Sequence, residues 1–324
     1  MVSEVSVALL ATPDPLPDDG PMVSVLIPSY NYSQYIGEAI QSIMDQTYRN
    51  LEIVVIDNCS TDDSWEVIQE IAGDDKRFSL HRNETNVGIL ENFRRCFQVA
   101  NGEFFMVLNA DDRVMSAHAI SRLVAALTSG PDVTLATSDR QLISEGGNYL
   151  RTDTAPFCSA DIVIDGIAFG DLILSQMGNR VSEASTLFRK DLLPVDDDFY
   201  CIAGVECSYY IDIVWWLKLF ALGRVAYIAE ALGQFRVHAG QSSMSHVQDP
   251  SALPAWSPII KGAKELGFLA DRDVERSCLC ALGQMMFVYL PGYAGAEESS
   301  LKELFRLMYD VAASVATLTL SAET

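Results

Sequence analysis

The chain has 324 residues, of which 49% are hydrophobic, so it is long enough to bury a substantial core and is not a disordered protein. It carries 22 Lys and Arg against 44 Asp and Glu, which gives a formal net charge of -22 at pH 7. Because duplex binding depends on neutralising phosphates, this acidic balance excludes nucleic acid as an expected partner.

The first 21 residues are expected to form a flexible tail. An apolar stretch at 5–10 has no Lys or Arg before it and is followed by a segment rich in Pro and Asp, unlike a signal peptide. The seven cysteines lack metal-finger spacing, which predicts reduced thiols in a cytoplasmic protein. The apolar stretch at 278–290 is too short to span a bilayer and predicts a buried helix, so no transmembrane segment is expected.

Four short apolar runs alternate with amphipathic segments in the first half of the chain. They lie at 23–27, 52–56, 104–108 and 133–137. Nearly continuous hydrophobic strands of this kind are typical of a parallel sheet that is covered on both faces. The segments between them keep helical spacing, and a weaker strand is predicted at 78–80. The pattern predicts a βαβαβ half-sheet.

The loops that follow these strands are polar. They comprise residues 28–31, 57–61, 86–88 and 109–112. In an open α/β sheet, ligands bind beyond the carboxyl ends of the strands, so these loops are expected to line one crevice. No Gly-x-Gly-x-x-Gly follows the first strand, and no Gly-Lys-Ser or Gly-Lys-Thr occurs, which argues against a dinucleotide or P-loop site.

Two adjacent carboxylates, Asp111 and Asp112, stand where a buried strand is expected to meet solvent. Because neighbouring carboxylates repel each other, this placement is tolerated mainly when water, a cation or donor hydrogen bonds compensate. In so acidic a chain, an anionic nucleotide would also need a local cation. A divalent metal held by carboxylates would meet both needs, whereas a capped turn before the next helix would account for only one of the two carboxylates.

These ordered motifs resemble glycosyltransferase family 2, the inverting nucleotide-diphosphosugar transferases with a GT-A fold. The matching segments are VSVLIPSYN at 23–31, IMDQTY at 43–48, EIVVIDNCSTD at 52–62, NVG at 86–88 and GE at 102–103. The resemblance implies an α/β, Rossmann-like fold with a mixed, mainly parallel sheet, helices on both faces and a C-terminal helical extension. It also implies a nucleotide-sugar donor.

The resemblance places the donor-binding residues at the strand ends. Asp57 would accept a hydrogen bond from a uracil-like imide N–H, or would only organise a turn, which is the role expected of Asp62. Asn86 and Gly88 would close over the nucleotide, unless Gly88 simply supplies a positive φ. The implied donor-binding set is Pro28, Ser29, Tyr30, Asn31, Asp57, Asn86, Gly88, Asn109 and Asp111.

The metal motif departs from the family pattern. That motif is usually Asp-x-Asp, and its first position here is Asn109. An amide is a weaker and neutral ligand, so Asp112 would hold the cation, Mg²⁺ or Mn²⁺, while Asp111 would bind the ribose or a metal-bound water.

A later segment, QFRVHAGQSS at 234–243, resembles the family's Tyr-Arg-x-His segment. By this resemblance His238 would complete the metal shell or touch the diphosphate, unless it is a hydrogen-bonded structural residue. Arg236 would pair with the diphosphate. The acceptor side is expected to include a strand-like segment at 184–188, and the candidates for sugar contacts there are Asn179, Glu183 and Ser185.

The candidate general base comes from DIVWWLKL at 212–219, which resembles the family's Asp-x-x-Leu-Trp-Leu segment. An inverting transfer needs one carboxylate to take the proton of the acceptor hydroxyl while the anomeric carbon is attacked opposite to the leaving nucleoside diphosphate. Asp212 is assigned this role, and Glu206 is the second candidate. Asp212 would also cap an apolar helix, a role that is compatible with an ionised base.

The expected organisation has three parts. Residues 1–21 form the tail, 22–245 the GT-A domain and 246–324 a helical extension, with the GT-A domain divided into a nucleotide-binding half at 22–138 and an acceptor half at 139–245. In the extension one helix face is expected to carry Leu301, Leu304, Phe305 and Met308. This face would pack on the catalytic domain or mediate formation of a homo-oligomer.

The expected function is metal-dependent, inverting transfer of a sugar from a UDP-sugar to a glycan or lipid-linked glycan in polysaccharide biosynthesis. The expected place is the cytoplasm, with peripheral binding to the inner face of the membrane left open. One alternative is a sugar nucleotidyltransferase, which normally carries a Gly-rich, basic loop that residues 28–32 lack. The other is an inactive sugar-nucleotide-binding regulatory or scaffold protein, which Asn109 motivates.

Overall fold

The computed structural model describes residues 7–10, 20–154, 158–177, 181–196, 198–241, 249–294 and 296–320. The chain divides into two compact units. The first comprises 1–165, 180–195 and 222–237, and the second comprises 166–179, 196–221 and 238–324. The second unit therefore groups part of the expected acceptor half with the C-terminal helices.

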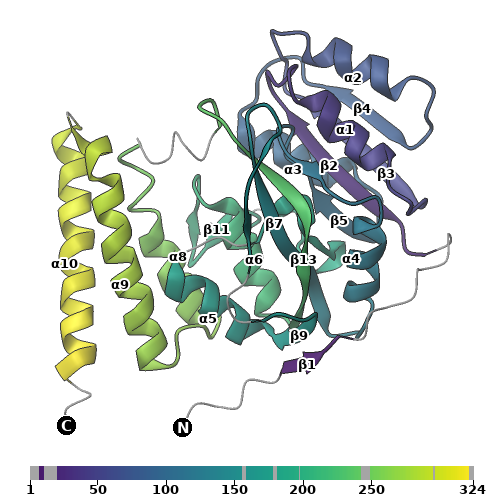
Figure 1. The fold of residues 1–324 in the computed structure, drawn as a ribbon. Coiled ribbons are helices and arrows are strands. Elements are labelled where there is room, and N and C mark those ends of the chain that lie inside the picture. The colour runs from purple at the N-terminus through teal and green to yellow at the C-terminus, as the bar shows by residue number, and fades with distance from the viewer. Residues whose placement is uncertain are drawn as a thin grey trace. The chain divides into compact units, whose positions relative to one another are not determined.

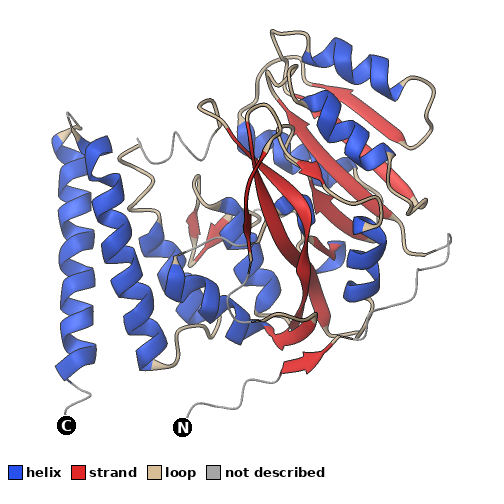
Figure 2. Cartoon of the chain, viewed as in Figure 1, coloured by secondary structure: helices blue, strands red, loops and turns tan. Residues whose placement is uncertain are grey.

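The first unit is built on one sheet, whose strands are coloured red in Figure 2. The path across the sheet is β1, β9, β13, β7, β10, β5, β2, β3 and β4, with β6 paired to β13 and β8 paired to β7. The strands are β1 (Val7–Leu9), β2 (Val23–Ser29), β3 (Leu51–Asp57), β4 (Phe78–Arg82), β5 (Phe104–Val107), β6 (Arg113–Val114), β7 (Val133–Ser144), β8 (Tyr149–Asp153), β9 (Ile162–Asp165), β10 (Leu187–Arg189) and β13 (Arg224–Val237). The pairs β5/β2, β2/β3, β3/β4 and β7/β13 are parallel, and β10 is antiparallel to both of its neighbours.

Helices cover both faces of this sheet (Figure 1). They are α1 (Ile36–Met44), α2 (Ser64–Ala72), α3 (Ile89–Val99) and α4 (Ala119–Leu127). Buried residues of α1, α2 and α4 share one core with alternate strand residues such as Val25 and Met106. On the opposite face, Phe97 of α3 lies with its ring centroid 5.6 Å from that of Phe105 in β5. The mixed, mainly parallel sheet between two helical layers confirms the expected fold class.

Three neighbouring parallel strands, β2, β3 and β4, end at the same position along the strand direction. In the register, Ser29 of β2 is opposite Asp57 of β3, and Asp57 is opposite Arg82 of β4. The last residues of β2, β3 and β4 therefore form a row at the edge of the sheet where ligands bind in open α/β folds.

Three parts of the first unit differ from the sequence prediction. The strand predicted at 133–137 runs on to Ser144, because its polar second half pairs with both β13 and β8. The strand-like segment 184–188 begins as the 3₁₀ turn η1 (Glu183–Ser185) and becomes a strand only at Leu187. Residues Val7–Leu9, predicted to belong to a loose tail, form strand β1 against β9.

The second unit is mainly helical. Its elements are α5 (Gly166–Gln176), β11 (Cys201–Ile202), β12 (Val205–Glu206), α6 (Ile211–Phe220), α8 (Trp256–Glu265), α9 (Arg272–Tyr289), the 3₁₀ turn η3 (Leu290–Tyr293) and α10 (Glu298–Leu320). Gly170 of α5 allows close packing, since a Cβ there would lie 2.3 Å from the Phe268 ring. Within the described residues, no helix is both long and apolar enough to cross a membrane.

Helices α9 and α10 lie side by side and bury a narrower face than predicted. The buried residues of α10 are Leu304, Leu307 and Val311, whereas Phe305, expected on the inner face, is 63% exposed. The reason is that α10 packs mainly on α9, and one partner helix covers only one stripe. Helix α9 contacts both α5 and α10, yet Phe287 and Val288 remain exposed, so the helix predicted to be buried is buried over only part of its surface.

Candidate functional site

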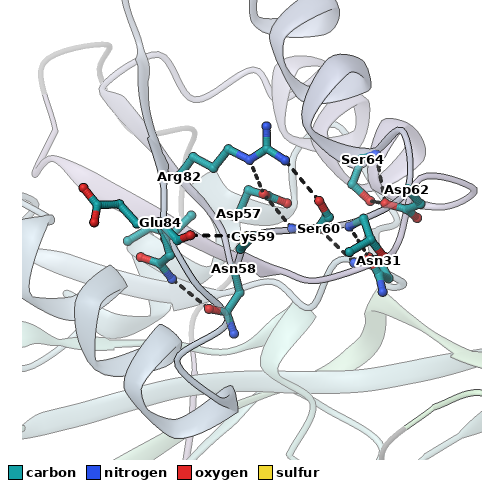
Figure 3. Close-up of polar contacts among 12 residues, drawn as sticks. Asn31, Asp57, Asn58, Cys59, Ser60, Asp62, Ser64, Arg82 and Glu84 are labelled. Carbon is teal, nitrogen blue, oxygen red and sulfur yellow. Dashed lines mark hydrogen bonds and ion pairs between the residues drawn. The ribbon is translucent and has the colours of Figure 1, made fainter.

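Asp57, the last residue of β3, is completely buried, and its two carboxylate oxygens have different surroundings. Oδ2 accepts from the backbone N–H of Ser60 at 3.0 Å and lies 3.2 Å from Nε of Arg82. Figure 3 shows Arg82 reaching from the end of β4 over Asp57 and Ser60. Among the described residues, Oδ1 has no hydrogen-bond partner, so it is the oxygen left for a ligand.

The loop after β2 is tied to the loop after β3. Asn31 has a φ of 57°, its backbone N–H donates to Ser60 Oγ at 2.9 Å, and its Oδ1 accepts from the backbone of Thr61 at 2.8 Å. Of the other predicted donor residues in this loop, Ser29 is buried and Tyr30 is exposed on the surface, while Pro28 is partly buried. These bonds fix the two loops against each other.

Asp62 organises the same turn. It accepts from the backbone N–H groups of Ser33 and Ser64, each at 3.0 Å. Burial alone would raise the pKa of Asp62, but the hydrogen bonds from Ser64 and Ser33 hold this pKa below its usual value. This is the structural role expected from the sequence.

Asn58, next to Asp57, holds the predicted nucleotide loop in place. Its Nδ2 donates to Asn86 Oδ1 at 2.9 Å and to the Gly88 carbonyl at 3.2 Å. Its Oδ1 accepts from the Val87 backbone at 3.0 Å and from Asn83 Nδ2 at 2.9 Å. The structure therefore brings Asp57, Asn86 and Gly88 together, as expected from the sequence.

Sequence reasoning missed Arg82 and Asn83 as parts of this site, and it placed Asn58 in the loop 57–61 without giving it a role. A signal for Arg82 was available in the sequence. Arg82 lies just after one predicted strand and Asp57 just after its parallel neighbour, and the carboxyl ends of neighbouring parallel strands lie at the same side of a sheet. For Asn58 and Asn83 no such signal existed, since an amide that follows a strand is common in any turn.

The acidic pair follows β5, as predicted. Asp112 is 1% exposed, and its backbone N–H donates to the Asn109 carbonyl at 3.0 Å, which closes the turn. Its Oδ1 accepts from the Arg236 backbone at 2.8 Å, whereas Oδ2 is buried with no hydrogen bond to any described residue. Burial and then the charge of Asp111 raise the pKa of Asp112 well above its usual range.

The acidic turn also faces the loop after β2. Burial, the charges of Asp111 and Asp112, and a hydrogen bond to Asp111 together raise the pKa of the Tyr32 hydroxyl. The backbone N–H of Tyr32 donates to Ser64 Oγ at 2.9 Å. The loop after β2 thus links the Asp57 region and the acidic turn along one edge of the sheet.

The acceptor-side candidates lie in different settings. Glu183, in η1, contributes to the raised pKa of Asp112, so its charge acts on the acidic turn. Ser185 is buried, and its hydroxyl donates to the Ser182 carbonyl at 3.4 Å, within the same turn. Asn179 lies outside the described residues.

The predicted general bases belong to the second unit. Asp212 is in the first turn of α6 and partly exposed, where the helix macrodipole favours its ionised form. Glu206 is exposed in β12. His238 is nearly buried, and its backbone N–H donates to Gln241 Oε1 at 2.7 Å.

Arg236, predicted to pair with a diphosphate, lies near the end of β13 with its side chain 1% exposed. Its Nε, Nη1 and Nη2 atoms each donate to a protein oxygen. Each nitrogen of the guanidinium therefore contacts an acceptor within the protein.

The acidic turn offers a cation two carboxylates. In the parts of the chain that the structure describes, no group of three or more His, Cys, Asp or Glu residues is arranged to hold a metal ion. Magnesium in proteins is often held by one or two carboxylates together with phosphates of the substrate. The orphaned Oδ2 of Asp112 fits such a shared site.

Comparison with known proteins agrees with this architecture. A family model described as glycosyl transferase family 2 matches residues 24–189. An uncharacterized glycosyltransferase of Haemophilus influenzae is 30% identical over 242 residues, which cover 72% of this chain and 71% of the relative.

Solved structures share the fold at low sequence identity. Staphylococcus aureus TarS 1-349 in complex with UDP-GlcNAc has a TM-score of 0.61 and 16% identity, covering 91% of this chain and 81% of TarS 1-349. The mannosyltransferase PcManGT from Pyrobaculum calidifontis, in complex with GDP-Man and Mn²⁺, has a TM-score of 0.59 and 15% identity, covering 98% and 91%. With a family model that spans half of its length, this chain belongs to glycosyl transferase family 2 and is a glycosyltransferase.

Proposed function

We propose that this enzyme is a metal-dependent, inverting glycosyltransferase that moves a sugar from a UDP-sugar to a glycan or lipid-linked glycan in polysaccharide biosynthesis. The observation that carries the proposal is the pair of orphaned carboxylate oxygens, Asp57 Oδ1 and Asp112 Oδ2, which are buried at the end of β3 and in the turn after β5. Buried carboxylate oxygens without a partner are costly, so they point to donors or a cation supplied by a ligand.

Asp57 supports a base that offers an N–H donor. Because Ser60 and Arg82 occupy Oδ2, the carboxylate is oriented with Oδ1 as its remaining acceptor. The imide N–H of uracil would complete this bond, whereas the corresponding ring nitrogen of cytosine is an acceptor and would face the carboxylate unfavourably. The enzyme should therefore bind UDP more tightly than CDP, and Asp57→Asn should reduce the difference between the two affinities.

Asp112, assisted by Asp111, is proposed to hold Mg²⁺ or Mn²⁺. When bound, the divalent cation would neutralise charge that develops on the departing diphosphate. A relative in fold, PcManGT, was solved with GDP-Man and Mn²⁺, which agrees with this proposal. His238 is proposed as a third candidate ligand of this cation.

Asp212 is proposed to take the proton from the acceptor hydroxyl, with Glu206 as the second candidate. It lies in the first turn of α6, at the positive end of the helix macrodipole, and a base must be ionised before it reacts. Attack opposite to the leaving diphosphate would invert the anomeric configuration.

The proposed setting is the cytoplasm, where nucleotide sugars would meet the acceptor, with peripheral membrane binding left open. None of the seven cysteines is in a disulfide, and the proposal assigns them reduced thiols in a reducing compartment. The proposal includes formation of a homo-oligomer through α9 and α10, because apolar residues of these helices, such as Phe305, are exposed.

The test is turnover of a panel of nucleotide sugars with and without Mn²⁺. Loss of a general base typically costs about 10²–10⁴-fold in rate, so Asp212→Asn should fall by this amount, and Asp112→Asn should lose the metal-dependent rate. Asp132→Asn is the control, because Asp132 pairs with Arg224 at the opposite end of β13. Full activity in Asp112→Asn or Asp212→Asn would remove that residue from the mechanism, and donor binding without any turnover would favour an inactive binding protein.

A further inference from the structure

A buried guanidinium lies directly behind the acidic turn. Arg236 Nε donates to the Asp111 carbonyl at 2.7 Å, Nη1 to the Glu145 carbonyl at 2.8 Å and Nη2 to Glu38 Oε2 at 2.7 Å. The guanidinium also lies over the ring of Tyr35, 4.9 Å from its centroid. Since a buried charge is stable only when it is paired and hydrogen-bonded, these contacts account for its placement.

The backbone of Arg236 acts on Asp112 itself. Its N–H donates to Oδ1 at 2.8 Å, which leaves Oδ2 as the buried oxygen without a partner among the described residues. One residue therefore fixes the turn twice, through the carbonyl of Asp111 and through the carboxylate of Asp112. Which oxygen of Asp112 is left for a ligand is decided by this bond.

A second arginine extends the same connection. Arg113 donates from Nη1 to Glu38 Oε2 at 2.8 Å and from Nη2 to the Gly147 carbonyl at 3.0 Å. Both arginines thus join the acidic turn to Glu38 of α1 and to the turn between β7 and β8. The turn carrying Asp111 and Asp112 is held from three elements that are distant in sequence.

We propose that Arg236 is a positioning residue for the cation site rather than a contact to the diphosphate. It acts through Asp111 and Asp112, and its planar guanidinium donates from three separate nitrogens to acceptors on three different residues, a geometry that the compact ammonium of a lysine does not reproduce. This inference rests on the proposed function, because the residues that Arg236 would hold in position are the proposed metal ligands.

The test compares Arg236→Lys with Arg224→Lys. Arg224 is a matched control because it begins the same strand and pairs with Asp132 through two hydrogen bonds, at the end of β13 opposite to Arg236. Mn²⁺ binding in the presence of UDP is measured from the electron paramagnetic resonance signal of free Mn²⁺, without turnover. Activity is then measured at rising Mn²⁺ concentration.

The expected result is at least about tenfold weaker Mn²⁺ binding in Arg236→Lys, as the loss of a ligand's supporting partner typically causes, with a maximal rate that approaches wild type at saturating Mn²⁺. Arg224→Lys should bind Mn²⁺ like wild type. Glu38→Gln, which weakens the same anchor without changing Arg236, should shift Mn²⁺ binding in the same direction by a smaller factor.

Two different failures can be told apart. If wild type binds Mn²⁺ with UDP and Arg236→Lys binds it equally well, the positioning role is overturned while the proposed function stands. A reduced melting temperature of Arg236→Lys with unchanged Mn²⁺ affinity also overturns the positioning role, because it shows that Arg236 serves stability alone. If wild type binds no Mn²⁺ in the presence of UDP, the proposed function fails, and the positioning role fails with it.

Discussion

Two residues beside Asp57 adopt the left-handed backbone conformation, and they are suited to it to different degrees. Asn31, with a φ of 57°, has a side chain that tolerates this region and forms local hydrogen bonds in it. Cys59, with a φ of 61°, has no such advantage. Its thiol makes one long contact with the Glu84 carbonyl, at 3.6 Å.

Replacement of Cys59 by glycine should therefore stabilise the protein. The left-handed conformation costs an L-residue about 1–2 kcal/mol, and glycine adopts it freely, so the net gain after the greater entropy of unfolded glycine should be about 1 kcal/mol. Urea denaturation measures it. Cys59→Ala is the matched control, because it removes the thiol and keeps the strain; an equal gain in both variants would refute the argument from φ.

At the scale of elements, the side-chain amide of Asn58 holds the loop beyond β3 against the loop beyond β4. The buried side chain of Asn58 makes four hydrogen bonds, to Asn86, Gly88, Val87 and Asn83. Removal of a buried partner leaves the others unsatisfied, which costs more than the bond itself contributed.

We expect Asn58→Ala to lower the free energy of unfolding by about 1–3 kcal/mol and to weaken UDP binding, because the 86–88 loop loses its anchor. Chemical denaturation and calorimetry measure the two effects. Asn58→Asp retains the two accepted bonds but turns a buried carboxylate oxygen toward the acceptors Asn86 Oδ1 and the Gly88 carbonyl, so it should be at least as unstable as Asn58→Ala. Unchanged stability of Asn58→Ala would show that the loop is held by other contacts.

The elements that could be predicted from sequence are those whose signal is local. The apolar runs that form β2, β3 and β5 place Asp57, Asp111 and Asp112 at strand ends without knowledge of any partner. The long β7 and the interposed antiparallel β10 could not be predicted, because their pairing depends on segments far away in sequence. Cross-strand pairing overrides local propensity in such cases.

The same distinction holds for the site. The position of Asp57 at a strand end could be predicted from the apolar run before it, whereas the burial of Arg236 against Glu38 joins residues 198 positions apart. No local pattern separates an arginine that faces a ligand from one that is enclosed by acceptors. The predicted role of Asp212 as base stays a prediction.

For the whole molecule, the net charge of -22 sets the electrostatic context of a negatively charged donor. Without divalent metal, a nucleoside diphosphate approaches a protein of the same sign, and salt screens this repulsion. The affinity of the metal-free enzyme for UDP should therefore increase about two- to fivefold between about 20 and about 200 mM KCl. Uridine, which is uncharged, should show no such change; weaker UDP binding at higher salt would indicate a local cationic site that dominates over the net charge.

The central claim is that the donor diphosphate is held through a cation on Asp112. Calorimetric titration of UDP into wild type and Asp112→Asn, each with and without Mn²⁺, tests it most directly. The account predicts that Mn²⁺ strengthens UDP binding to wild type at least about tenfold and leaves its binding to Asp112→Asn nearly unchanged. An equal gain in both proteins, or no gain in wild type, would contradict the claim.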